Sequence, residues 1–456
     1  MFPLKPVFIS PHSGGGQSGI LALRHGSTLK LPWRTPQIKD TVSVLLAILG
    51  ITVTSGVCYL TLCRAHPIFA YEGDYISFRT KAEFFTKAEI EQKEYETWKL
   101  NTDIKYKGLT VQHPAKGIIH VKTTKWINGK PIKLNIVEIN PKANSKLQIK
   151  PKTASTGVLN RKASIRNIAN AENSIVAING GYFKPQTGVP LGTLVIDNNV
   201  LTGPIYNRVA LGINSNGTFS MDRSSIDIAI KGKKRIIKAD NINQPRMLST
   251  YTLVYTEKWG AMTPPAPKYG MAAAVKDGVV VNYGYGAVEI PKGGFSVVGP
   301  KQNIEVLLNE KNINMDIRFS DTFKNSEHII GGGPYLVKNG QMYVDINDQK
   351  FGAINGKNPR TAIGYTKNNE LIIVTVDGRE ETSVGMTLWE ISKVMKDLGC
   401  EYAMNLDGGG SSVIYVKGKI ENTPAYREGI AISNAIVINE VKSPDNIANV
   451  EDKSYQ

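Results

Sequence analysis

The sequence predicts an α+β fold, with a mixed, largely antiparallel sheet and a few packed helices, preceded by one N-terminal transmembrane helix. Short β-rich runs between turn signals dominate the chain from residue 118 onward, which is typical of hairpins. Only two segments of that region have convincing helical spacing of their apolar residues. Near the N-terminus, a run of 23 uncharged residues, 41–63, is long enough to cross a bilayer as a helix.

Composition places the chain among ordinary globular proteins, because 41% of its 456 residues are apolar and 21% are charged. The net charge of +16 suits an acidic partner, but a diffuse excess of lysine also serves solubility alone. The nearest approach to a basic run is Lys231 to Arg235, which lacks interleaved aromatic residues. Nucleic-acid binding is therefore not expected.

The N-terminal region predicts a single-pass membrane protein. Residues 1–40 are a basic tail with one acid, Asp40, so the positive-inside rule keeps them cytoplasmic. Residues 41–63 form the expected signal anchor, although a buried helix or cleavage after Ala70 are alternatives. Residues 64–110 are expected to be a partly helical stalk, which places the main domain in the periplasm or outside the cell. Cys400 is the one cysteine beyond the anchor, so no internal disulfide is expected there.

The main domain is expected over residues 111–440, followed by a flexible tail over 441–456. Its first hairpins fall within residues 118–125, 133–139 and 147–149. A helix over 162–171 leads to a buried strand over 174–178, which ends at Asn179, Gly180, Gly181 and Tyr182. Further strands are expected within 272–283, 305–308, 329–338 and 361–376.

A second helix is predicted to begin at Thr387, with Gly399 after its last turn. Thr387 and Glu390 have the spacing of a capping box, so capping is favoured over catalysis for Glu390. A strand over 401–406 follows and ends at Asp407, three glycines and two serines. Because a further strand over 413–417 comes next, this loop lacks the strand–turn–helix context of a dinucleotide site.

Five ordered motifs carry a resemblance to a known family. They are Asn179 to Phe183, Ile329 to Pro334, Asn358 to Gly364, Val376 to Arg379 and Asn405 to Ser412. In this order they resemble phosphodiester glycosidase domains, the group related to the mannose 6-phosphate uncovering enzyme. The resemblance spans roughly residues 118 to 440 and implies hydrolysis of a sugar-1-phosphodiester.

The resemblance implies a cleft built from the ends of the strands. Asp377 and Asp407 form the expected catalytic acidic pair, with the acting carboxylate of the two left open. Planar guanidinium groups suit a phosphate, so Arg360 and Arg379 are the expected anion contacts. The remaining expected substrate contacts are Asn179, Gly180, Gly181, Tyr182, Gly332, Gly333, Thr361, Asn405, Gly408, Gly409, Gly410, Ser411 and Ser412.

Each of these residues also has a structural alternative. Both Asp-Gly pairs suit a hairpin turn, Arg360 can brace the sheet by pairing with a carboxylate, and Asn179 can cap a turn. Two functions therefore stand side by side: a membrane-anchored exported glycosidase acting on a phosphate-linked glycan, and a non-catalytic glycan-binding or envelope-assembly protein on the same fold. No cofactor is evident. Carboxylates and backbone carbonyls near the glycine loops leave calcium as an open alternative, although no EF-hand spacing indicates it.

Overall fold

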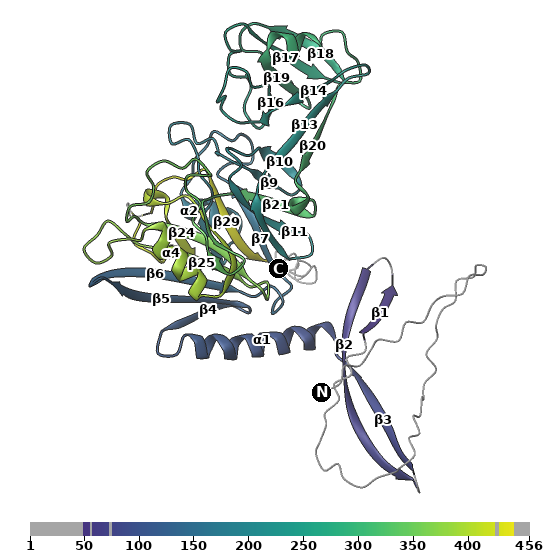
Figure 1. Cartoon of the computed structure of the whole chain (residues 1–456), viewed down its shortest axis with the longest axis vertical. Coiled ribbons are helices and arrows are strands. Elements are labelled where there is room, and N and C mark those ends of the chain that lie inside the picture. The colour runs from purple at the N-terminus through teal and green to yellow at the C-terminus, as the bar shows by residue number, and fades with distance from the viewer. Residues whose placement is uncertain (1–48, 55–56, 73–74, 425–427, 442–456) are drawn as a thin grey trace, which may run out of the picture. The chain divides into compact units, whose positions relative to one another are not determined.

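The computed structural model describes residues 49–54, 57–72, 75–424 and 428–441, with side chains from residue 85 onward. It separates into two compact units, Met1–Ile90 and Glu91–Gln456 (Figure 1). In the first unit, β1 (Leu49–Thr54), β2 (Val57–Glu72) and β3 (Tyr75–Phe84) form one antiparallel sheet. The predicted cytoplasmic tail and nearly all of the predicted C-terminal tail lie outside the described residues.

The predicted transmembrane helix is not found in the described part of its span. Residues 49–54 and 57–63 lie in β1 and β2, whereas 41–48, 55 and 56 are outside the described residues. The run is rich in the β-branched residues Val, Ile and Thr, which favour strands over helices. Among the described helices, none is both long enough and apolar enough to cross a membrane.

The largest sheet of the second unit has eight strands and confirms the predicted antiparallel pairing. In spatial order its strands are β23 (Gln341–Met342), β22 (Tyr335–Lys338), β26 (Cys400–Asn405), β24 (Arg360–Thr366), β25 (Leu371–Val376), β6 (Lys130–Ile139), β5 (Ile118–Ile127) and β4 (Val111–Ala115). Every described pairing in this sheet is antiparallel.

Two five-stranded sheets share the main core with it. One has the order β28 (Lys419–Ile420), β27 (Ile414–Val416), β8 (Val176–Asn179), β29 (Asn434–Glu440) and β7 (Leu147–Thr153). The other has the order β10 (Asn199–Thr202), β9 (Leu194–Ile196), β21 (Ser326–Gly331), β11 (Val209–Asn214) and β12 (Phe219–Arg223). Ile178, Leu211 and Ile363 represent the three sheets in one buried apolar cluster. The candidate site therefore grows from strand ends that a common core holds in place.

Helices cover the outer faces of two of these sheets (Figure 1). Helix α4 (Leu388–Asp397) places Leu388, Ile391 and Met395 against the eight-stranded sheet. Helix α2 (Ile165–Ala171), capped by Ser164, packs Ile165 and Ile168 on the sheet that contains β8. Both helices confirm the sequence prediction, because their apolar residues recur every three or four positions.

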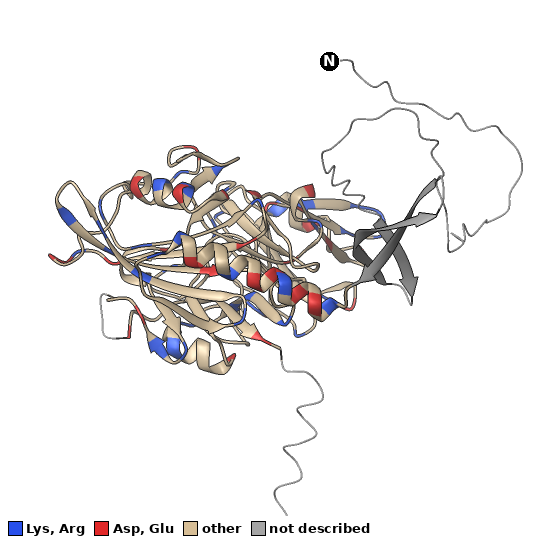
Figure 2. Cartoon of the chain, turned by 90° about the horizontal axis from the view of Figure 1, so that it is seen from below, with Lys and Arg blue, Asp and Glu red and all other residues tan. Residues whose placement is uncertain are grey.

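Helix α1 (Lys87–Lys105) differs from the predicted solvated stalk. Its exposed faces alternate acidic and basic side chains, as Figure 2 shows. However, Trp98 and Thr102 are buried, and Trp98 packs in the core beneath the eight-stranded sheet. The burial repeats every four residues from Trp98 through Thr102 to Tyr106, so one face of the helix packs against the domain. The C-terminal half of α1 is thus part of the main domain.

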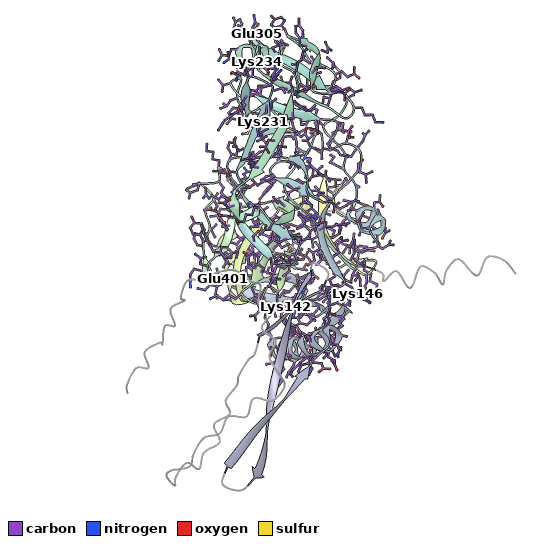
Figure 3. All side chains as sticks on the ribbon, turned by 90° about the vertical axis from the view of Figure 1, so that its right-hand side faces the viewer. Lys142, Lys146, Lys231, Lys234, Glu305 and Glu401 are labelled. Atoms are coloured by element: carbon purple, nitrogen blue, oxygen red, sulfur yellow. The ribbon has the colours of Figure 1, made fainter. Side chains whose placement is uncertain are left out.

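An insert between β12 and β21 has its own two sheets. The smaller one is β14 (Ile236–Ala239), β13 (Ile226–Lys231) and β20 (Asn314–Phe319). The larger one is β15 (Asn241–Ile242), β16 (Leu253–Thr256), β19 (Phe295–Pro300), β17 (Gly270–Lys276) and β18 (Val279–Gly284), with α3 (Lys301–Glu305) packed on it. Strands β15 and β16 pair in parallel. The basic run around Lys231 and Lys234 belongs to this insert (Figure 3).

One predicted strand of the insert is wrong. Residues 305–308 were expected to be extended, but Glu305 ends helix α3 and the following residues form a turn. Ile304 and Leu307 are both buried, and their spacing of three residues fits a helical turn and not a strand. A short apolar run cannot be assigned by periodicity alone, which explains the error.

Candidate functional site

The Asp407 loop joins two strands, as the sequence predicts. It leaves β26 at Asn405, makes a short 3-10 turn, η2 (Gly409–Ser411), and enters β27. Gly409 has φ +60°, and a Cβ atom there would lie 3.0 Å from Nη2 of Arg379. The second of the three glycines is therefore required both by its backbone conformation and by the close approach of an arginine.

The Asp407 carboxylate is oriented by its own loop. Oδ1 accepts a hydrogen bond from the Gly408 N–H at 2.9 Å, and Oδ2 accepts one from the Ser411 hydroxyl at 2.6 Å. Both bonds favour the ionised form, but loss of hydration outweighs them and raises the pKa of Asp407 to about 6. A carboxylate with this pKa exchanges its proton close to neutral pH, as a catalytic acid or base must.

Asn179 ties the end of β8 to this loop. Its Nδ2 donates to the backbone oxygen of Asp407 at 2.8 Å. Its Oδ1 accepts from the Thr361 hydroxyl at 2.7 Å and from the Val413 N–H at 3.2 Å. The Asp407 N–H in turn donates to the carbonyl of Gly180. Because the side chains of Asn179 and Thr361 are buried and bonded to each other, these two residues position the loop.

The phenol of Tyr182 lies within the electrostatic influence of three charged side chains of the site. Its hydroxyl donates to the Gly333 carbonyl at 2.8 Å and accepts from Nδ2 of Asn405 at 2.9 Å. Burial and the negative charge of Asp407 raise the pKa of Tyr182, whereas the positive charges of Arg208 and Arg360 oppose that rise. One carboxylate and two guanidinium groups therefore act electrostatically on the same phenol.

Asn405 leaves a buried acceptor beside this phenol. The side chain is 1% exposed, and its Oδ1 has no hydrogen-bond partner among the described residues. The hydroxyl of Ser412, on the same loop, is buried and unpartnered in the same way within the described ranges. Buried polar atoms are normally satisfied, so these two groups mark places where a bound hydroxyl or water can complete the bonding.

The glycines of the predicted motifs serve close packing. The N–H groups of Gly180, Gly332 and Gly333 donate to backbone carbonyls, and that of Gly181 donates to Oδ1 of Asn434. The N–H groups of Gly332 and Gly333 are thus engaged by the carbonyls of Val209 and Asn405, and contact of these glycines with a substrate stays a prediction. A Cβ atom on Gly181 would lie 2.4 Å from the Gly331 carbonyl oxygen, so the two glycine turns cross with no room for a side chain.

Arg360 is a brace of a kind that the sequence did not suggest. Its Nε donates to the Met386 carbonyl at 3.0 Å, and its Nη2 donates to the carbonyls of Ile354 and Gly356, both at 2.6 Å. The residue is 4% exposed, and burial lowers its pKa. The expected carboxylate partner is not among its hydrogen bonds. Arg360 thus fastens the loop over 354–356 to the start of α4, and its buried charge remains uncompensated by an acid there.

Arg379 presents its guanidinium at the surface of the glycine loop. The residue is exposed, has φ +68° and donates from Nε and Nη2 to Oδ1 of Asn358 at 3.2 and 2.9 Å. The contact with Asn358 orients the guanidinium toward Gly409. This arrangement leaves an exposed, oriented cation beside the Asp407 loop, as an anion site requires.

Asp377 has partners that set it apart from Asp407. Both of its carboxylate oxygens accept from the Thr423 N–H at 3.0 Å, and burial is the main cause that raises its pKa. Asp407 is not among its hydrogen-bond partners or among the charges that shift its pKa. Asp377 therefore holds the segment around Thr423, and its catalytic pairing with Asp407 stays a prediction.

The sequence did not single out Arg208. This residue precedes β11, and its Cζ lies 3.7 Å from the ring centroid of Phe351 and 5.6 Å from that of Tyr182. Its Nε donates to the Gln349 carbonyl at 3.2 Å. Its neighbour Tyr206 is local, with the ring centroid 5.6 Å away, but Phe351 and Tyr182 are distant in the sequence, so the sequence alone does not place Arg208 at the site. Arg208 is the third arginine around Tyr182 and the Asp407 loop, together with Arg360 and Arg379.

Among the described residues, Asp407 is not part of a group of three or more acidic, histidine or cysteine side chains that could share an ion. Within the described residues, the group of acidic and histidine side chains close enough to share an ion is Asp197, Glu327 and His328. These residues lie on the sheet of β9 and β21, and Nδ1 of His328 already accepts the Asp197 N–H at 3.0 Å.

Comparison with known proteins assigns the family. Residues 254–439 match the family model described as phosphodiester glycosidase. These residues form a region of the phosphodiester glycosidase family, and the match covers less than half of the chain. Its matched region begins within the insert, at β16, and extends through β29, so it contains the Asp407 loop, Arg360, Arg379 and Asp377.

Curated relatives share only part of their length with this family member. N-acetylglucosamine-1-phosphodiester alpha-N-acetylglucosaminidase of Mus musculus is 29% identical over 108 residues, covering 21% of this chain and 21% of the relative. The Homo sapiens protein of the same name is 28% identical over 116 residues, covering 23% and 22%. The SPbeta prophage-derived uncharacterized protein YomE of Bacillus subtilis (strain 168) is 33% identical over 152 residues, covering 33% and 23%.

Solved structures extend the likeness in fold to most of the chain. A hypothetical protein from Synechocystis superposes with a TM-score of 0.67 at 20% identity, covering 86% of this chain and 76% of that one. A putative exported protein from Burkholderia pseudomallei K96243 superposes with a TM-score of 0.57 at 18% identity, covering 83% and 86%. At these identities the likeness concerns the fold alone.

Proposed function

We propose that this phosphodiester glycosidase family member hydrolyses a sugar-1-phosphodiester, releasing the sugar from a phosphate-linked glycan or envelope polymer. The observation that carries the proposal is the Asp407 carboxylate, whose pKa burial raises to about 6 and whose glycine loop lies against the guanidinium of Arg379. A buried acid that is costly to ionise, with the exposed cation of Arg379 at its loop, matches the charges of the reaction.

The proposed reaction breaks the bond between the anomeric carbon and the phosphate oxygen. The phosphomonoester leaves with the bonding electrons, while positive charge develops on the sugar ring. Ionised Asp407 stabilises that charge and accepts a proton from the water that adds to the anomeric carbon. Arg379 and Arg208 are placed to hold the departing phosphate, and the buried charge of Arg360 adds to the positive field.

The names of the curated relatives suggest the first substrate to test. Two of them are named for N-acetylglucosamine-1-phosphodiester, so we propose a diester of this sugar as the starting compound. The matches cover only 21% and 22% of those relatives, so the identity of the sugar is part of the proposal.

The proposal keeps the expected location, an exported domain anchored by residues 41–63. It rests on the 23 uncharged residues of that run and on the basic tail before it. Membrane fractionation of the full chain and of a chain that lacks residues 1–63 tests the anchor. Recovery of both in the soluble fraction would contradict it.

A non-catalytic glycan-binding role has one observation in its favour. Asp377 accepts the Thr423 N–H with both carboxylate oxygens, which supports a structural role for one of the two expected catalytic acids. A binding protein would retain the diester without releasing the sugar. The same assay distinguishes the two functions.

The experiment measures release of N-acetylglucosamine from methyl N-acetylglucosaminyl phosphate. For Asp407→Asn we expect a loss of kcat/KM of roughly a hundredfold to ten-thousandfold, the usual contribution of acid–base catalysis. In the wild-type protein, kcat/KM should fall tenfold for each pH unit below about 6 and be level above it, because the ionised carboxylate is the active form.

Asp227→Asn is the matched control, because the Asp227 side chain is 66% exposed on the insert. This variant should keep wild-type turnover. Equal activity of Asp407→Asn and the wild type would overturn the assignment of Asp407. A rate that instead falls as the pH rises through 6 would show that the protonated form acts.

A further inference from the structure

A hollow of about 680 Å³ is lined in part by Phe351, the aromatic neighbour of Tyr182. Its wall is formed mainly by the segment over 343–355 together with Trp389 of α4. Tyr343 and Trp389 are 39% and 48% exposed, respectively, so their rings are open to a ligand. The volume falls in the range of small-molecule sites, which are about 300–1,000 Å³.

We propose that this hollow is a subsite for neutral sugar rings of the glycan that carries the scissile diester. Aromatic faces pack against the apolar face of a pyranose, while nearby amides bond its hydroxyls. The hollow offers both, since Asn347 and Asn355 line it beside Tyr343 and Trp389. The inference rests on the proposed function and extends it from a small diester to a longer saccharide.

The charges of the hollow favour a neutral ligand over a phosphate. Asp345 lines it and is engaged by Arg223 at 2.7 Å and by the Tyr335 N–H at 3.0 Å. Asp348 also lines it and keeps a side chain that is 64% exposed, 3.4 Å from Arg223. An exposed carboxylate repels a phosphodiester, so the anion belongs with the arginines and the hollow takes uncharged rings.

Two contacts connect the hollow to the Asp407 site. The Phe351 ring, which lines the hollow, lies 5.3 Å from the Tyr182 ring and 3.7 Å from Cζ of Arg208. Arg360 binds the carbonyls of Ile354 and Gly356 in the segment that forms the wall. A saccharide that is bound in the hollow therefore lies against the same aromatic ring that supports the charged site.

The first measurement is calorimetric binding of uncharged chitotetraose, maltotetraose and mannotetraose to full-length protein that carries Asp407→Asn. We expect at least one of the three to bind, and adding Trp389→Ala to weaken that binding about tenfold, as loss of an aromatic contact does. Ala353→Trp, which fills the hollow from an exposed lining position, should weaken it at least as much. Adding Trp126→Ala is the matched control, because Trp126 is 70% exposed on β5 and should leave binding unchanged.

The second measurement compares diesters with the otherwise wild-type protein. One is methyl N-acetylglucosaminyl phosphate, and two others carry a tetrasaccharide on the sugar side or on the phosphate side. Trp389→Ala should raise KM about tenfold for one of the longer diesters and change kcat/KM of the methyl diester less than about twofold.

The outcomes separate this inference from the proposed function. Binding of no tetrasaccharide, or equal weakening by the Trp389 and Trp126 variants, would overturn the subsite. An equal rise in KM for short and long diesters would do the same. If no diester is turned over but Trp389→Ala still abolishes tetrasaccharide binding, the glycosidase assignment fails and the sugar site stands.

Discussion

At the scale of single residues, Asp407 is a buried carboxylate whose ionisation costs free energy in the folded protein. The ordinary aspartate carboxylate is well hydrated, whereas here the Gly408 N–H and the Ser411 hydroxyl replace water only in part. The pKa rises to about 6 because burial penalises the charged form more than these bonds support it. Functional carboxylates are often held in this way, at the expense of stability.

This cost predicts that Asp407→Asn stabilises the fold at neutral pH. The pKa of Asp407 is higher in the folded protein than in the unfolded chain. Protonation of Asp407 therefore stabilises the folded state fully at low pH, and this stabilisation is lost as the pH rises through about 6. Asparagine stays uncharged and can still accept from the Gly408 N–H. We expect a gain of about 1–3 kcal/mol in the free energy of unfolding at pH 7.5.

Urea unfolding at pH 4.5 and 7.5 measures this effect. The gain should shrink toward pH 4.5, where wild-type Asp407 is protonated in the folded protein. Asp227→Asn, at an exposed position, should show little change at either pH. A destabilisation of Asp407→Asn that is the same at both pH values would instead assign Asp407 a purely structural role in the turn.

At the scale of elements, the site depends on a loop fastened to a helix. Arg360, at the first position of β24, donates to the carbonyls of Ile354, Gly356 and Met386. Helix α4 begins just beyond Met386 with a complete capping box between Thr387 and Glu390. The structure thus confirms the capping role predicted for Glu390. The brace and the cap together fix where the 350–356 segment meets α4.

Arg360→Met should release that segment. Three carbonyls lose charged donors, and the Met386 carbonyl lies at a buried residue, so we expect a loss of about 1–3 kcal/mol in the free energy of unfolding. Backbone N–H groups of residues 350–356 should also exchange hydrogen faster. Arg379→Met is the paired control, because Arg379 is exposed and its guanidinium donates to the side chain of Asn358 and not to a loop carbonyl.

The two arginine variants also separate a structural brace from an anion contact. Arg379→Met should leave the unfolding free energy within about 0.5 kcal/mol of the wild type and raise KM for the methyl diester. Unchanged stability of Arg360→Met, with a rise in KM alone, would show that Arg360 acts mainly on the substrate and not on the loop.

At the scale of the whole molecule, helix α1 decides where the stable domain begins. Trp98 and Tyr106 are buried in the core below the eight-stranded sheet, and the Tyr106 hydroxyl donates to the buried Glu138 carboxylate. Thr86 caps the start of the helix through Glu89. The domain therefore begins with α1 and not at the first hairpin.

We expect a fragment of residues 86–456 to unfold with a single transition. A fragment of residues 107–456 should lose several kcal/mol, since removal of a buried tryptophan alone costs about 3–5 kcal/mol. Thermal unfolding of the two fragments, with the full chain as reference, measures the difference. Equal midpoints would show that α1 contributes nothing to the stability of the domain.

The sequence by itself determined the largely antiparallel α+β class, the strand–loop–strand setting of Asp407 and the cap at Thr387. These features depend on neighbours within a few positions, which local periodicity and turn chemistry report. Tertiary structure alone decided that Arg208 joins the site, that Asp377 faces Thr423, and that the pKa of Asp407 lies near 6. The burial of a side chain and the charges around it depend on residues that come from distant strands. A local sequence pattern therefore cannot predict these contacts.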